Sequence, residues 1–94
     1  MRNEKKMKLR AGLDRMHDNV TTLVNNYFRI HSRLPDFQCL DNMWIAVSDR
    51  INDPTVRARL RQVRCNGYIR QPDETIGVIL GIPQNVQDSL GSIE

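Results

Sequence analysis

The chain has little of what marks a secreted, membrane-bound or disulfide-rich protein. Its 94 residues include only two cysteines, Cys39 and Cys65, and neither lies in a CxxC or Cys/His motif. We expect both to be free, buried thiols, as in a reducing compartment. The charged N-terminus MRNEKKMKLRAG lacks the apolar segment of a signal peptide. No stretch approaches the roughly 20 apolar residues that span a bilayer. We therefore predict a cytoplasmic protein.

The sequence also lacks the motifs of common enzymes, with no glycine-rich phosphate loop and no nucleophile elbow. His17 and His31 are 14 residues apart on one expected helix, about 21 Å, which is too far to share a metal ion. Asp14, His17 and Asp18 are close in sequence, but no second cluster would complete a site. We predict no catalysis, no metal and no cofactor.

The chain has only a small excess of positive over negative charge. Lys and Arg number 14 against 11 Asp and Glu, a net charge of +3, and 39% of the residues are hydrophobic. This composition is typical of one small globular domain, here taken as residues 1–94. A mild positive charge permits nucleic-acid binding without requiring it. Because small domains are often marginally stable alone, we also expect self-association.

The first third of the chain carries a heptad pattern, which predicts a long helix over about 3–32. Pro35 ends the pattern, since the residue before a proline avoids helical geometry. Val24 and Phe28 widen the apolar stripe, so the helix is expected to pack on other helices, to pair with a second copy, or both. The pattern does not choose between a dimer and a tetramer. The predicted seam is Leu9, Leu13, Met16, Val20, Leu23, Tyr27, Ile30 and Leu34.

The remaining chain is predicted to form four shorter helices, at about 37–52, 54–65, 73–80 and 84–90. Asp36 and the pair Asp53-Pro54 are helix-start signals. Asn66-Gly67 is a helix end, followed by a short extended link at 68–70. No segment has the period-two alternation of a strand. The predicted fold is therefore all-α: a long N-terminal helix packed with about four shorter ones.

The segment TIGVILGIPQNVQDSL, residues 75–90, has the form of a helix-turn-helix corner. Gly77 and Gly81 stand at the crossing and the turn, and IGVILGIP resembles the first helix and turn of many bacterial helix-turn-helix regulators. Gln84, Asn85 and Gln87 could hydrogen-bond to base edges. The last twelve residues contain no Lys or Arg, however, and so lack the phosphate attraction that supplies most DNA affinity. We expect this corner to be structural.

Positive charge is denser in the expected third helix. Arg57, Arg61 and Arg64 recur at i, i+4 and i+7, and Arg70 follows. Arginine makes forked contacts with carboxylates and phosphates, so this stripe is a candidate anion-binding surface for a phosphate backbone or an acidic protein. A solvated helix face is the alternative interpretation. A second basic cluster comprises Arg2, Lys5, Lys6, Lys8 and Arg10.

The chain resembles the derepression (antirepressor) proteins among the small regulators of temperate phages and their satellites. The resemblance rests on its size, on the helix LDRMHDNVTTLVNNYFRI and on the missing cations of IPQNVQDSL. It implies oligomerisation through the long helix and a transcriptional repressor, rather than DNA, as the target. Our leading hypothesis is therefore a homo-oligomeric, protein-binding regulator of this type. The alternative is a dimeric helix-turn-helix DNA-binding regulator.

Overall fold

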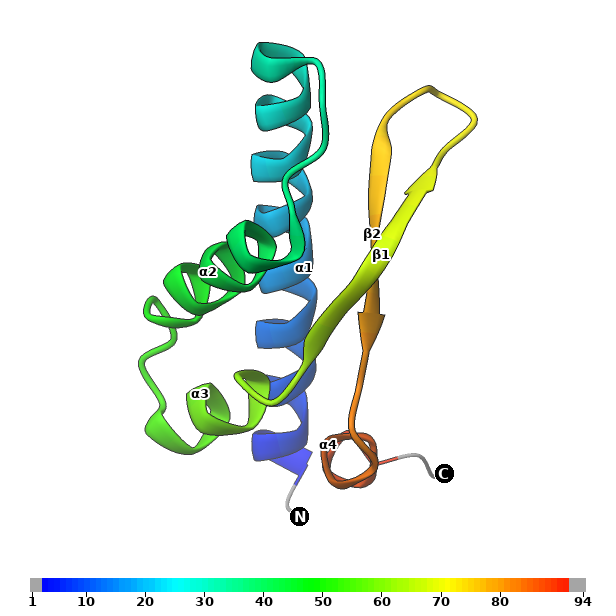
Figure 1. Cartoon of the computed structure of the whole chain (residues 1–94). Helices are drawn as coiled ribbons and strands as arrows, with labels where there is room; N and C mark the ends of the chain where they lie inside the picture. The colour runs from blue at the N-terminus through cyan, green and yellow to red at the C-terminus, as the bar shows by residue number, and fades with distance from the viewer. Residues whose placement is uncertain (1–2, 92–94) are drawn as a thin grey trace.

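The computed structural model describes residues 3–91, which form four helices and one two-stranded sheet (Figure 1). In chain order the elements are α1 (Asn3–His31), α2 (Phe37–Ser48), α3 (Pro54–Leu60), β1 (Arg64–Arg70), β2 (Ile76–Gly81) and α4 (Gln84–Ser89).

Helix α1 is the axis around which the other elements are arranged. A 29-residue helix is about 43 Å long, which equals the longest dimension of the molecule, 43 Å. Helices α2 and α3 lie along one side of α1, the hairpin lies along another, and α4 lies beside the start of α1 (Figure 1). Within the described residues, no helix is long and apolar enough to cross a membrane.

Local capping signals set the starts of α2 and α3. The Asp36 carboxylate accepts a hydrogen bond from the backbone N–H of Cys39 at 2.8 Å, so it caps α2. The Asp53 carboxylate accepts from the N–H groups of Thr55 and Val56 at 2.9 and 3.2 Å. Side-chain caps of this kind satisfy backbone donors that have no partner inside the helix.

The all-α prediction is wrong, because the segment expected as a helix over 73–80 forms strand β2. Strand β2 pairs antiparallel with β1, and a bulge lies between Cys65 and Gly67. The expected extended link at 68–70 is therefore part of a strand. The expected third helix is also shorter, ending at Leu60. The predicted helix-turn-helix corner at 75–90 is consequently wrong as well.

The physical reason lies in the composition of this segment. A short apolar run such as IGVILG has no period that separates a strand from a buried helix. Its β-branched residues favour a strand, and its two glycines disfavour a helix. The turn before it is closed by Asp73, whose carboxylate accepts hydrogen bonds from the N–H and hydroxyl of Thr75 at 3.1 and 2.6 Å. Glu74, in the same turn, has a left-handed φ of 69°.

The predicted heptad seam divides into two halves in the structure. The first four seam residues, Leu9 to Val20, are buried in the core of the chain itself. Beyond them burial shifts by one position, to Val24, as expected for a straight helix with 3.6 residues per turn. Leu23 and Ile30 are 40% and 67% exposed, whereas Tyr27 and Leu34 are half-buried. Only the second half of the seam is therefore open to a second copy, and oligomerisation through it stays a prediction.

Candidate functional site: a basic cleft at the α2–α3 turn

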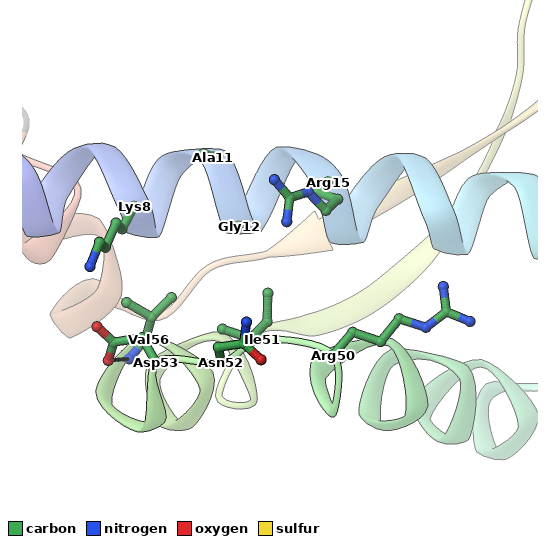
Figure 2. A pocket seen from close by; sticks show the side chains of 9 residues that line it. All are labelled: Lys8, Ala11, Gly12, Arg15, Arg50, Ile51, Asn52, Asp53 and Val56. Carbon is green, nitrogen blue, oxygen red and sulfur yellow. Dashed lines mark hydrogen bonds between the residues drawn. The ribbon is translucent and has the colours of Figure 1, made fainter.

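A cleft of about 350 Å³ lies between the first half of α1 and the turn that joins α2 to α3. Figure 2 shows side chains from α1 facing side chains from the turn across this space. This basic cleft is lined by Lys8, Ala11, Gly12, Arg15, Arg50, Ile51, Asn52, Asp53 and Val56.

Gly12 allows α1 to approach the α2–α3 turn closely. A Cβ atom at this position would lie 2.9 Å from a terminal methyl group of Leu60 and 3.6 Å from methyl groups of Ile51 and Val56. A glycine inside a helix is unfavourable by about 1 kcal/mol relative to alanine, so its presence here is explained by packing rather than by helix propensity. The close approach forms the floor of the basic cleft.

The lining of the cleft carries three cations, Lys8, Arg15 and Arg50, and one carboxylate, Asp53. All three cations are exposed. Hydrogen bonds from the N–H groups of Val56 and Thr55 lower the pKa of Asp53, and the positive charge of Lys5 and Lys8 lowers it further. The ionised Asp53 offsets one of the three positive charges, which leaves the lining with a net charge of about +2 that attracts an anion.

The turn between α2 and α3 is braced by polar contacts. The indole N–H of Trp44 donates to the carbonyl of Leu60 at 2.8 Å, in a buried hydrogen bond that joins the two helices. The buried Ser48 hydroxyl accepts from Nε of Arg61 at 2.8 Å, and Arg61 also forms an ion pair with Asp49. Nη1 of Arg57 donates to the carbonyl of Ile51 at 2.9 Å. The angle between the two helices is thus set by groups at both ends of the turn.

The arginines predicted as a partner-binding stripe do not share one free face. Arg57 and Arg61 are half-buried and bond to the α2–α3 turn. Arg64 is exposed, and its guanidinium donates to the carbonyl of Arg61 at 2.7 Å. The guanidinium of Arg70 lies 5.9 Å from the ring centre of Phe28, on a different part of the molecule. Helix α3 ends before Arg61, so the spacing that defined the stripe does not apply there.

The three candidate DNA-reading residues lie on α4, which follows a strand rather than a helix. Each is exposed and bonds within the chain. The Gln84 amide donates to Asp88 at 3.0 Å, the Asn85 amide to Gln62 at 2.7 Å, and the Gln87 amide to the carbonyl of Ile82 at 2.8 Å. The second basic cluster contributes Lys8 to the cleft. Arg2 lies outside the described residues.

Sequence reasoning missed Arg15 and Arg50, which lie far apart in the chain and show no shared pattern. One available signal was Gly12, because a glycine inside a strong helical pattern often marks a close approach of another segment. Together with the start signal Asp53-Pro54, it could have placed the α2–α3 turn against α1.

Comparison of the chain with models of protein families, with characterised proteins and with solved structures finds no match. The fold is mixed, with helices predominating and one antiparallel hairpin.

Proposed function

We propose that this protein binds duplex DNA through α2, α3 and the basic cleft. The observation that carries the proposal is the placement of three exposed cations, Lys8, Arg15 and Arg50, around the turn of a two-helix unit. Two helices joined by a short turn form the common unit that lays its second helix in the major groove while the first crosses the backbone. Here five residues, 49–53, join α2 to α3.

The proposed contacts are of two kinds: contacts to phosphates, which position the protein on DNA, and contacts to base edges, which recognise the sequence. The three cations of the cleft would hold phosphate oxygens, which supply most of the affinity and carry no sequence information. Helix α3 would supply the reading face, because Thr55 and Ala58 are exposed whereas Val56 and Leu60 are buried. Threonine can hydrogen-bond to several bases, and its methyl group, like that of alanine, can contact a thymine methyl group. The brace between Trp44 and Leu60 would keep α3 at a constant angle during binding.

The test is a salt titration of binding to random-sequence duplex DNA, followed by fluorescence anisotropy. We expect a Kd on the order of 1–100 μM that weakens steeply with salt, as is usual for non-specific binding. Each of the substitutions Lys8→Glu, Arg15→Glu and Arg50→Glu should weaken binding. Each should also reduce the slope of log K against log salt by about 1, the value for one lost phosphate contact.

The matched control is Arg33→Glu, which makes the same change of charge at an exposed residue in the link between α1 and α2. This link lies at the opposite end of α1 from the cleft (Figure 1). If Arg33→Glu weakens binding as much as Arg15→Glu does, the cleft is not the site. Absence of binding at 20–50 mM salt by a folded protein would refute DNA binding altogether.

A protein-binding regulator of the antirepressor type is the second candidate. The observation that favours it is apolar exposure on α2, where Phe37 and Ile45 are 56% and 45% exposed and stand two helical turns apart. Large exposed apolar side chains dominate the energetics of many protein interfaces. If DNA binding fails, capture of a repressor by the wild-type protein but not by a Phe37→Glu/Ile45→Glu variant would support this second candidate.

A further inference from the structure

The two edges of the hairpin differ in how they are protected. On β2, the side-chain amide of Asn25 from α1 bonds to the main chain of Ile76 as a neighbouring strand would. Its Oδ1 accepts from the N–H of Ile76 at 2.8 Å, and its Nδ2 donates to the carbonyl of the same residue at 2.8 Å. Nε2 of His17 lies 2.7 Å from the carbonyl oxygen of Val78, further along the same edge. Helix α1 therefore closes the outer edge of β2.

These bonds also fix which backbone groups of β1 point outward. Since Ile76 gives its N–H to Asn25, its pair with Arg70 is a non-hydrogen-bonded pair of the ladder. The pattern alternates, so Ile69 bonds to Gly77, and the pair of Tyr68 with Val78 is again non-hydrogen-bonded. The N–H and carbonyl groups of Tyr68 and Arg70 consequently point away from β2. Among residues 3–91 the sheet contains only β1 and β2, so no strand meets this edge.

The free edge of β1 at Tyr68–Arg70 has no proline and meets no strand among residues 3–91, and the protective features of β1, the bulge between Cys65 and Gly67 and the charge of Arg70, lie on either side of Ile69. Such edges are commonly blocked by proline, by a charged residue at the centre or by a covering helix. Between Tyr68 and Arg70 stands Ile69, which is 55% exposed, and its face of the hairpin also carries Ile79, 45% exposed. Gly67 and Gly77 pair with Ile79 and Ile69, so this face has no other side chain on those two rungs. The result is an apolar strip beside an open row of hydrogen-bonding groups.

The same edge is complementary to itself. Two copies of β1 can run antiparallel about a two-fold axis at Ile69, so that Tyr68 of each copy lies opposite Arg70 of the other. Both residues direct their backbone groups outward, so each opposed pair exchanges two hydrogen bonds. Ile69 then faces Ile69 in the closer, non-hydrogen-bonded pair, where Cα atoms are about 4.5 Å apart. Each arginine faces a tyrosine, and no like charges are opposed.

We propose that the occupant of this edge is a second copy of the chain, which joins two hairpins into one four-stranded antiparallel sheet. This inference is independent of DNA binding. The expected self-association would then take place at the edge of β1 and not at the heptad seam, half of which is buried within the chain. The covered edge of β2 explains why only one strand is available, so the assembly closes at two copies.

The test is sedimentation equilibrium of the full chain and of four variants from about 5 μM to 1 mM. Arg70→Pro removes an N–H that makes no bond within the hairpin and places a ring at the edge, where proline is tolerated in a strand. It should raise the dimer Kd at least tenfold, because two of four intermolecular hydrogen bonds are lost. Arg70→Ala keeps the N–H and is the matched control. Ile69→Lys opposes two ammonium groups and should also abolish dimerisation.

Amide hydrogen exchange provides a measurement that needs no variant. The amides of Tyr68 and Arg70 should gain protection as protein concentration rises, whereas the amide of Ile69, bonded within the hairpin, should be protected throughout. A wild-type protein that stays monomeric to 1 mM would overturn the proposal. So would a dimer that survives Ile69→Lys but dissociates with Ile30→Lys, because Ile30 is 67% exposed on α1 and reports on the heptad seam instead.

Discussion

Replacing Asn25 by alanine should destabilise the fold through a residue 51 positions away. Asn25 places its side-chain amide at the main chain of Ile76, a residue that is only 4% exposed. Alanine would leave one backbone N–H and one carbonyl without their partner. A buried polar group that loses its partner costs about 1–3 kcal/mol. The two groups together cost about 2–6 kcal/mol and alanine regains about 0.5 kcal/mol of helix propensity, so the expected net loss is about 1.5–5.5 kcal/mol.

Urea unfolding followed by the fluorescence of Trp44, the only tryptophan and 2% exposed, measures this loss directly. Asn25→Asp keeps the acceptor for the Ile76 N–H but removes the donor to its carbonyl, so it should cost roughly half as much. Asn26→Ala is the matched control, because Asn26 is exposed and its side chain accepts a long hydrogen bond, 3.4 Å, from Arg29. It should change stability by no more than a few tenths of a kcal/mol.

A loss below about 0.5 kcal/mol for Asn25→Ala would refute the reasoning. It would mean that water replaces the amide at Ile76 and that α1 does not hold the edge of β2. The β2 edge would then be as open as the β1 edge, and the two edges of the hairpin would no longer differ. An equal loss in Asn25→Ala and Asn26→Ala would instead indicate a general effect on α1.

Two further perturbations test the packing at the cleft and the burial of titratable groups. Gly12→Val should lower the free energy of unfolding by about 1–3 kcal/mol, since its Cβ would lie 2.9 Å from a methyl group of Leu60. Ala11→Val, at the exposed neighbouring residue, should lower it only by the difference in helix propensity between alanine and valine. Equal losses for the two variants in thermal unfolding would contradict the close approach of α1 at Gly12. Burial raises the pKa of the Cys65 thiol from 9.0 to about 11 and that of the Tyr68 phenol from 10.0 to about 12. Because the folded state keeps these protons to higher pH than the unfolded chain does, their contribution to stability is full below about pH 9 and is lost as pH rises toward 12. The urea midpoint should therefore fall between pH 8 and pH 10.5, and a constant midpoint would contradict the burial of both groups.

Signals that act within a few residues predicted the helical part of the fold. The heptad pattern placed a helix over about 3–32, and α1 spans Asn3–His31. Asp36 and Asp53-Pro54 stand where capping residues were expected, directly before α2 and α3. Such signals are readable because their partners lie two or three positions away. Where local signals were ambiguous, as at Asn66-Gly67, a helix end was expected and a β-bulge was found.

The hairpin could not be predicted in the same way. The run IGVILG suits a buried helix or a strand, and the choice was decided by its pairing with Arg64–Arg70 and by Asn25 on α1. The turn at 71–75 that permits this pairing was taken for the start of a helix. The pairing of two strands leaves no signal in the sequence unless apolar and polar residues alternate along them. Neither strand shows that alternation, and this is why an all-α fold was expected.

The basic cleft separates most clearly what the sequence determined from what the tertiary structure decided. Composition and spacing alone determined a small, mildly basic chain with a long amphipathic helix, two capped helices after it and arginines near the third. Only the tertiary structure decided which cations line one cleft: Gly12 brings α1 against Leu60, and this contact places Lys8 and Arg15 on the wall that faces Asp53 and Arg50 (Figure 2). The tertiary structure also decided that Arg57 and Arg61 form hydrogen bonds within the chain, to the carbonyl of Ile51 and the hydroxyl of Ser48. The physical reason is that a side chain's freedom to bind a partner depends on what surrounds it in space, which spacing along the chain does not specify.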